Sequence, residues 1–204
     1  MQEALIIQFA KEPVPGQVKT RMLPALDLEQ AAKLHCDLVF WTVQTLTSAA
    51  VGDVELAVAG AVESPLFEQC RKLGVHEIRP QQGVGLGQRM FHALKDGLSR
   101  YRYVLLVGSD CPQIDSAYLR QALAALADSD VVLGPAEDGG YVLIGVKAVA
   151  WSWFDGVHWG TDSVYRQTVA RLEADGARWA ALHVLQDIDR PEDLHLWRRI
   201  AGAL

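Results

Sequence analysis

The sequence has few cysteines, no long hydrophobic run and no excess of basic residues, and each shortage excludes a class of protein. Its three cysteines, Cys36, Cys70 and Cys111, are odd in number and far apart, which fits free thiols in a reducing compartment. The sequence has no CxxC motif and no Cys/His spacing that would indicate a zinc site. The apolar run Leu5–Ala10 follows a start without basic residues and is too short for a signal peptide or a membrane span. We therefore expect a cytoplasmic protein with no membrane span.

The charge balance argues against a nucleic-acid partner. The 204 residues carry a formal net charge of −6, whereas binding to a phosphate backbone needs a basic face. A single nucleotide needs only a few local cations, so nucleotide binding stays open. No GxSxG motif is present, and no Ser/His/Asp set stands out. The length fits one domain over residues 1–204.

The hydrophobic pattern alternates between short apolar runs and amphipathic stretches. It predicts strands over 4–10, 53–60, 75–79, 102–107, 130–135, 140–146 and 177–185, and helices over 28–49, 64–73, 86–100, 115–127, 161–174 and 191–201. Asp27, Ser64 and Asp115 are the expected N-caps. Strands separated by helices favour an α/β fold with a mostly parallel sheet. The link between 135 and 140 is too short for a crossover, so we expect a mixed sheet with at least one antiparallel strand.

The most informative carboxylate is Asp110, which ends the apolar run Tyr103–Val107 after Gly108 and Ser109. Ligands of open α/β sheets bind at the carboxyl ends of strands. A carboxylate there needs a cationic partner, and a divalent metal followed by phosphates would supply one. The alternative is a purely local role, in which Asp110 caps the next helix or accepts hydrogen bonds from its own turn.

The loop after the first strand is the best candidate for an anion site. Lys11, Lys19 and Arg21 project from it, two prolines stiffen it, and Gly16 permits a turn. Arginine binds phosphate in bidentate fashion and lysine adds a point charge. The loop is not a P-loop, because the GxxxxGK[ST] spacing is absent. A solvated surface loop without a ligand is the alternative.

Two glycine-rich segments give weaker signals. Residues 82–90 open a helix with alternating glycines, and its amides, with Gly87 and Arg89, could receive a nucleotide. A flexible turn explains the same glycines nearly as well. Residues 136–141 lie between two short strands and form an ordinary hairpin turn or a substrate contact. The candidate substrate contacts there are Glu137, Asp138, Gly139 and Gly140.

The C-terminal part adds two more carboxylates. Asp187 and Asp189 follow the last predicted strand, and their spacing of two points both the same way in extended chain. One of them is expected to bind metal, while Asp189 is also a candidate cap for the helix opened by Pro191. Trp159 and Thr161, at a helix start, could line a pocket.

The ordered set of motifs resembles a known family. It comprises Lys-x4-Gly-x2-Lys-Thr-Arg within 9–22, Leu-Gly-Gln-Arg-Met at 86–90, Gly-Ser-Asp-Cys-Pro at 108–112, Glu-Asp-Gly-Gly-Tyr within 137–145 and Asp-Ile-Asp-Arg-Pro-Glu-Asp-Leu at 187–194. Together these segments resemble the DUF2064 family, also called radical-SAM/selenodomain-associated transferase 1, whose members are provisionally described as glycosyltransferases. The resemblance spans nearly the whole chain.

The resemblance implies a three-layer αβα fold of the GT-A, nucleotide-diphospho-sugar transferase type. It implies nucleotide phosphates on Lys11, Lys19 and Arg21, and a divalent metal, Mg²⁺ or Mn²⁺, on Asp110 with Asp189 or Asp187. The further nucleotide contacts we expect are Gly16, Gly87, Arg89 and Ser109. The expected catalytic residues are Lys19, Arg21, Asp110 and Asp138.

The expected function is metal-dependent transfer from a nucleotide donor to a small-molecule acceptor, foremost glycosyl transfer from an NDP-sugar. Nucleotidyl transfer from an NTP to a phosphorylated substrate, with release of pyrophosphate, is one alternative. It is favoured by a departure from the glycosyltransferase pattern: many GT-A enzymes carry Asp-x-Asp, whereas here Ser109-Asp110-Cys111 holds one carboxylate. A nucleotide-binding protein without turnover is the third possibility.

Overall fold

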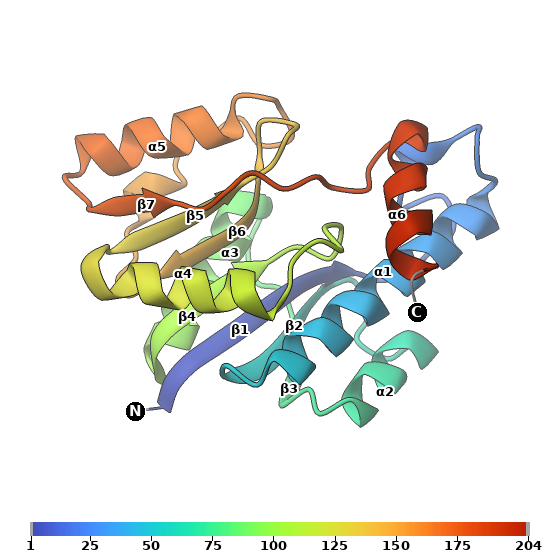
Figure 1. Ribbon diagram of the computed structural model, residues 1–204, viewed down its shortest axis with the longest axis horizontal. Helices are drawn as coiled ribbons and strands as arrows, with labels where there is room; N and C mark the ends of the chain where they lie inside the picture. The colour runs from blue at the N-terminus through green and yellow to red at the C-terminus, as the bar shows by residue number, and fades with distance from the viewer. Residues whose placement is uncertain (1, 203–204) are drawn as a thin grey trace.

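One mixed sheet organises the computed structural model, which describes residues 2–202. Its seven strands follow the order β3-β2-β1-β4-β6-β5-β7 (Figure 1). They are β1 (Gln2–Lys11), β2 (Asp53–Ala59), β3 (Glu77–Pro80), β4 (Tyr101–Val107), β5 (Val131–Pro135), β6 (Tyr141–Val146) and β7 (Trp179–Ala181). Only β6 is antiparallel to its neighbours, β4 and β5, while the other pairings are parallel. The predicted mixed, mostly parallel sheet is therefore confirmed.

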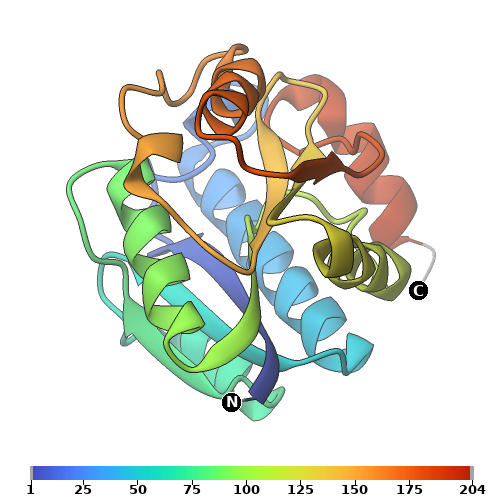
Figure 2. The same cartoon turned by 90° about the vertical axis from the view of Figure 1, so that its left-hand side faces the viewer.

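Helices cover both faces of the sheet. They are α1 (Leu28–Ala49), α2 (Pro65–Lys72), α3 (Leu86–Leu98), α4 (Ser116–Asp128), α5 (Val164–Ala174) and α6 (Leu194–Ala201), with 3₁₀ turns at Thr20–Met22, Trp151–Trp153 and Pro191–Asp193. The apolar contacts place α1, α2 and α4 on one face and α3 and α5 on the other (Figures 1 and 2). This is the expected three-layer αβα arrangement. None of the helices in the described part of the chain is long and apolar enough to cross a bilayer.

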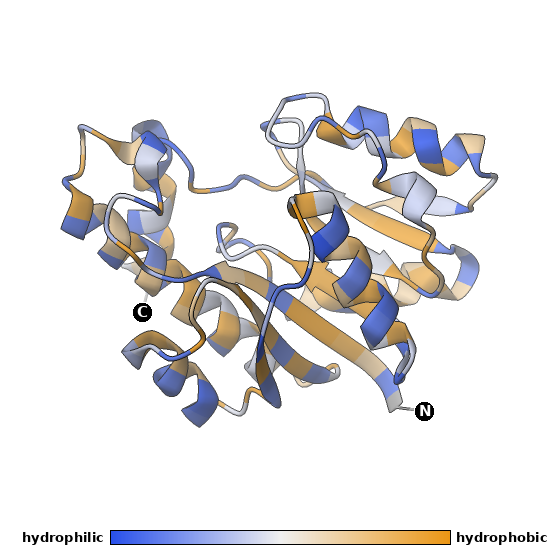
Figure 3. Ribbon diagram, turned by 180° about the vertical axis from the view of Figure 1, so that it is seen from behind, coloured by the Kyte–Doolittle hydropathy of each residue, from blue (hydrophilic) through white to orange (hydrophobic). Residues whose placement is uncertain are grey.

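Local sequence signals explain where most elements begin. The Asp27 carboxylate accepts from the Gln30 amide, Ser64 from Phe67, and Asp115 from Tyr118, so all three predicted N-caps are confirmed. Figure 3 shows the central strands as almost continuously hydrophobic, as expected for strands buried on both faces.

Several expectations about element length are wrong. The strand expected over 177–185 is regular only at Trp179–Ala181, because the chain there lies at the sheet edge with Val184 exposed. It then continues beside β5 through isolated contacts, such as the Leu185 amide to the Pro135 carbonyl at 3.0 Å. The helix expected from Thr161 begins at Val164, since the Thr161 hydroxyl donates to the His158 carbonyl and forms a separate turn.

The chain after β7 positions the late carboxylates. Residues 185–190, which we call the crossing segment, run over the ends of the strands to α6 (Figure 1). The Ile188 amide donates to the Asp110 carbonyl at 2.8 Å, and the Ile188 side chain is buried with Leu38 and Leu196. Because Leu185 is bound to β5 and Ile188 to Asp110, the crossing segment brings Asp187 and Asp189 next to the end of β4.

Candidate active site at the carboxyl edge of the sheet

Strands β1 and β4 are neighbours in the centre of the sheet. After β1 the chain continues to β2 on one side of this pair, and after β4 it continues to β5 on the other side. Such a switch point leaves a crevice outside the strand ends in α/β folds. The start of antiparallel β6 lies at the same edge, because Val107 pairs with Leu143. The loop after β1, Asp110 and the crossing segment therefore meet there, as the sequence predicts, and the structure adds the 136–140 turn to the same edge.

Lys19 holds the acidic cluster together. Its Nζ lies 2.8 Å from Asp110 Oδ1 and 3.4 Å from Asp189 Oδ1, and it also donates to the Ile188 carbonyl. The lysine side chain is only 3% exposed. Burial by itself would lower the pKa of Lys19, but its carboxylate neighbours, Asp110 foremost, outweigh burial and raise it. The lysine is therefore a permanently charged cation at the base of the site.

Asp110 presents one oxygen inward and one outward. Its Oδ1 is buried against Lys19, while the side chain as a whole is 42% exposed. Burial opposes ionisation of this carboxyl, yet the charge of Lys19, with smaller contributions from His35 and Lys11, lowers its pKa. Asp110 is thus an anion whose second oxygen reaches solvent and makes no hydrogen bond within residues 2–202. It does not cap the next helix, because Asp115 does.

Arg21 and Asp189 form the outer ion pair. Arg21 Nη1 lies 2.6 Å from Asp189 Oδ2, with the arginine 54% exposed and the aspartate 33% exposed. Asp189 therefore shares its two oxygens between Lys19 and Arg21. The proposed capping role of Asp189 is wrong, because it is the Asp193 carboxylate that accepts from the Asp189 and Arg190 amides.

Asp187 makes no ion pair within residues 2–202. Burial, followed by the nearby charges of Asp110 and Asp138, raises the pKa of Asp187 to about 8, and Lys19 offsets this only in part. Among residues 2–202, no three Asp, Glu, His or Cys side chains gather closely enough to hold a metal by themselves. The charge of Asp110 thus acts on Asp187, whereas Asp189 is paired with the two cations.

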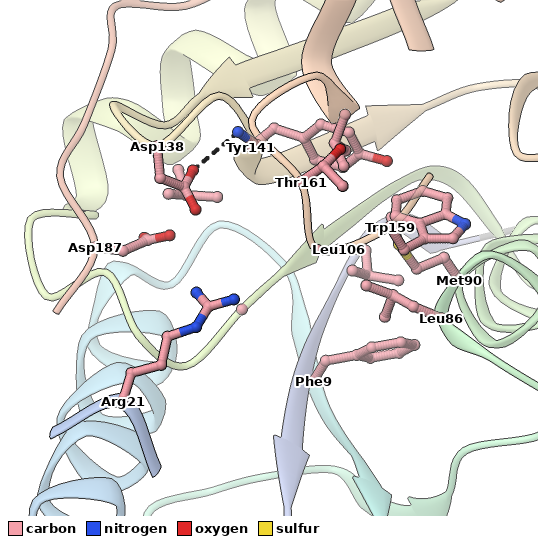
Figure 4. A pocket seen from close by; sticks show the side chains of 15 residues that line it. Phe9, Arg21, Leu86, Met90, Leu106, Asp138, Tyr141, Trp159, Thr161 and Asp187 are labelled. Carbon is pink, nitrogen blue, oxygen red and sulfur yellow. Dashed lines mark hydrogen bonds between the residues drawn. The ribbon is translucent and has the colours of Figure 1, made fainter. Parts of the chain in front are cut away.

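A cavity of about 210 Å³ opens beside this cluster. Figure 4 shows Asp138, Asp187 and Arg21 along one side and apolar side chains along the other. Asp138 is exposed, and its Oδ1 accepts from the Gly140 amide at 2.9 Å. The cavity is lined by Gly140, Trp159 and Thr161, as predicted, and also by residues without a functional signal in the sequence: Phe9, Leu86, Met90, Leu106 and Tyr141.

Two of the predicted contact residues, Ser109 and Gly139, have structural roles. The Ser109 hydroxyl is buried, donates to the Phe9 carbonyl at 2.7 Å and accepts from Gln8 at 2.8 Å, so its side chain is fully used in joining β1 to β4. Gly139 has a φ of +87° and lies against the Asp162 backbone, where a Cβ atom would come within 2.0 Å of the carbonyl oxygen. Packing and backbone conformation therefore require glycine at this position.

The β3–α3 loop is also fixed from within. Arg89 Nε donates to the Gly83 carbonyl at 3.2 Å, and the Val84 amide donates to Gln88 Oε1 at 2.9 Å. Gly87 is buried beneath Trp159, where a Cβ atom would lie 2.7 Å from the indole nitrogen. Lys11 is exposed as the last residue of β1, not in the loop as expected. Gly16 is exposed in the loop after β1, and Glu137 is exposed in the 136–140 turn.

Together, fold and site define an α/β protein with clustered cations and carboxylates at the switch point of its sheet. The chain belongs to the DUF2064 family, whose model, described as an uncharacterized protein conserved in bacteria, matches residues 42–161. No curated protein matches the chain.

Solved structures share the fold along the whole chain. A protein of Desulfovibrio desulfuricans G20, provisionally named a nucleotide-diphospho-sugar transferase, is 33% identical over 98% of this chain and 87% of its own, with a TM-score of 0.87. CMP:2-keto-3-deoxy-manno-octonic acid synthetase, solved with CTP, is 12% identical over 99% of both chains with a TM-score of 0.62. Rv0371c of Mycobacterium tuberculosis H37Rv, solved with manganese, is 16% identical over 100% of both chains with a TM-score of 0.54.

Proposed function

We propose that this protein is a divalent-metal-dependent transferase that uses a nucleotide donor, foremost an NDP-sugar, with its active site at the Lys19–Asp110 cluster. The observation that supports this most is the meeting of Lys19, Arg21, Asp110 and Asp187 beside a cavity at the switch point. The 33% identical structure, named as a nucleotide-diphospho-sugar transferase, points to the same donor class.

The carboxylate oxygens at this site suit a hard divalent cation. The free oxygen of Asp110 and the uncompensated carboxyl of Asp187 are the residues that would hold it, since oxygen ligands are preferred by Mg²⁺ and Mn²⁺. The manganese in the Mycobacterium tuberculosis neighbour is consistent with that choice. When bound, the cation would neutralise charge on the donor diphosphate.

The protein's own cations complete the charge balance. Arg21 is exposed and matches phosphate oxygens in bidentate fashion, and Lys11 adds a second exposed cation. Lys19, enclosed by carboxylates, keeps Asp110 and Asp189 in place. We therefore assign phosphate binding to Arg21 and Lys11, and positioning of the carboxylates to Lys19.

In glycosyl transfer, an acceptor hydroxyl oxygen forms a bond to the anomeric carbon of the donor sugar. The bond from that carbon to the diphosphate oxygen breaks, and the nucleoside diphosphate leaves with the electron pair. Asp138, whose Oδ2 makes no hydrogen bond within residues 2–202, accepts the hydroxyl proton. Positioning and charge neutralisation contribute most of the rate in such transfers.

Nucleotidyl transfer is the second candidate. The single carboxylate in Ser109-Asp110-Cys111 favours it over an Asp-x-Asp glycosyltransferase. A phosphate oxygen of the second substrate would then attack the α-phosphorus of an NTP, and pyrophosphate would leave.

Incubation with NDP-sugars or NTPs and Mg²⁺ or Mn²⁺ tests these proposals. Release of a nucleoside diphosphate supports glycosyl transfer, and release of pyrophosphate supports nucleotidyl transfer. Asp110→Ala should abolish either release. Asp37→Asn is a matched control, because Asp37 is 43% exposed and lies 2.7 Å from Lys33, much as Asp110 pairs with Lys19. Nucleotide binding without release of either product contradicts an enzymatic role.

A further inference from the structure

The cavity beside the acidic cluster is sharply divided in character. Toward the crossing segment it is bounded by Asp138, Asp187 and Arg21. Its opposite part is walled by side chains of β1, α3, β4, β6 and the loop before α5: Phe9, Leu86, Met90, Leu106, Tyr141 and Trp159 (Figure 4). The two halves therefore suit a ligand with one polar end and one apolar body.

The aromatic members of this wall turn carbon surface toward the cavity. The Tyr141 hydroxyl is buried beside Thr168, so it is directed away from the cavity. The Trp159 indole is fixed by stacking on Phe154, with ring centroids 6.4 Å apart, and by its seat over Gly87. The hydroxyls of a sugar ring placed against this wall would find no hydrogen-bond partner among its side chains, and an unpaired buried hydroxyl weakens binding.

The apolar surface also continues outward from the cavity. Leu86, in the wall, is 44% exposed, and Val84, two residues earlier, is 88% exposed. These side chains are not on a loose loop, because Gln88 binds the Val84 amide and His92 lies 3.1 Å from the Gln82 carbonyl. A rigid, exposed apolar edge next to a cavity is typical of a ligand-binding rim.

We propose that the second substrate is an alcohol or phenol whose hydroxyl is carried on an apolar, ring-sized body. The body fills the space between Phe9, Leu86 and Trp159, and the hydroxyl points to Asp138. This inference rests on the proposed transferase function and names the acceptor class for the same site. Free monosaccharides and other fully polar acceptors are disfavoured.

The test uses two probes of similar size and opposite polarity, 2-naphthol and glucose. Binding is followed by ligand-observed NMR and by isothermal titration, without nucleotide or metal. We expect 2-naphthol to bind at least tenfold more tightly than glucose. Equal binding, or tighter binding of glucose, would overturn the proposal.

Matched variants locate the binding. Leu86→Gln should weaken 2-naphthol binding about fivefold, whereas Val184→Gln, at another exposed apolar side chain outside the cavity, should leave it unchanged. Trp159→Ala, with Trp151→Ala as its control, should remove binding while circular dichroism confirms that both variants fold. If all four variants bind 2-naphthol as the parent does, the cavity is not its site and the proposal is wrong.

The outcome is separable from that of the transferase proposal. Stabilisation by Mn²⁺ and nucleoside diphosphates reports on the Asp110 cluster, whereas 2-naphthol binding reports on the apolar wall. A protein that binds nucleotide and Mn²⁺ but prefers glucose would keep its transferase role and lose the acceptor class proposed here. A protein that binds 2-naphthol but neither nucleotide nor metal would lose its transferase role instead.

Discussion

Lys19 Nζ lies 2.8 Å from Asp110 Oδ1, although 91 residues separate the two along the chain. Lys19 adopts a left-handed backbone conformation, with φ of 50°, which is uncommon for a residue other than glycine. That conformation turns its side chain beneath the crossing segment, where Asp110 and Asp189 surround it. Strain of this kind persists where the surrounding contacts determine the backbone, as they do at many functional sites.

Removing the lysine charge should destabilise the protein. Lys19→Met leaves Asp110 without its paired cation and Asp189 with Arg21 alone, and we expect a loss of about 2 kcal/mol, below the range for fully buried pairs because both carboxylates reach solvent. Urea unfolding measures the change. Lys33→Met, which breaks an exposed pair with Asp37, should cost less than about 0.5 kcal/mol. Equal losses in the two variants would contradict a special role for Lys19.

Arg21 should matter for turnover far more than for stability. We expect Arg21→Gln to lower kcat/KM for the nucleotide donor about 10–100-fold, because an exposed bidentate phosphate contact is lost. Its melting temperature should stay close to the parent value, since surface ion pairs contribute little. Arg178→Gln is the control, because Arg178 pairs with Asp130 at a distant edge of the sheet. A comparable loss of kcat/KM in the control would remove Arg21 from the site.

Asp187 should make the metal-free protein less stable as the pH rises. Its pKa in the folded protein is about 8, above the ordinary value of 3.8, so the folded state binds an extra proton between these values. The stability that this proton contributes is full below pH 3.8 and is lost as the pH rises through about 8. Asp187→Asn removes the ionisation, so its melting temperature should exceed that of the parent by a few degrees at about pH 8 and by less at about pH 5.

Differential scanning fluorimetry in EDTA, at several pH values, gives this comparison. Asp37→Asn should show no gain that grows with pH. The same Asp187→Asn protein should respond weakly to Mn²⁺, because a carboxylate ligand is gone. A gain in melting temperature that is independent of pH would show that Asp187 ionises normally in the folded protein.

Substitution of Gly139 should destabilise the protein, because this residue has a positive φ and lies against the Asp162 backbone. Gly139→Ala must adopt a φ of +87° and would place its Cβ atom 2.0 Å from the Asp162 carbonyl oxygen. We expect a loss of more than about 2 kcal/mol, and weakened binding in the cavity because the neighbours Gly140 and Thr161 line it. Gly74→Ala has a similar φ of +95° with open space around it, so it should cost about 1 kcal/mol. Chemical denaturation distinguishes the two, and equal losses would leave the Asp162 contact without consequence.

The sequence predicts the layers of this fold well because each layer has its own local signal. Buried strands are short apolar runs, α1 begins at Asp27 with a capping box, and the short link after Pro135 requires an antiparallel strand. The final strand is overestimated, because its apolar residues lie at a sheet edge where only Trp179–Ala181 pairs regularly. No local pattern distinguishes an edge from an interior strand of this length.

The site is predictable in location but only partly in detail. Strand ends identify Asp110, the loop with Lys19 and Arg21, and the crossing segment. Which carboxylate pairs with a cation depends on contacts between residues far apart in the chain. The spacing of Asp187 and Asp189 therefore does not show that Asp189 pairs with two cations and Asp187 with none. Phe9, Leu86 and Leu106 have the sequence pattern of ordinary core residues, so no local signal predicts that they line a cavity.

The most direct test is titration of the protein with ADP, CDP, GDP and UDP in the presence and absence of Mn²⁺, followed by calorimetry. We predict that at least one nucleotide binds in a Mn²⁺-dependent manner to the parent and to Asp37→Asn, and that Asp110→Ala loses this dependence while remaining folded. Nucleotide binding by Asp110→Ala with undiminished affinity and the same response to Mn²⁺ would contradict the assignment of the active site to the Lys19–Asp110 cluster.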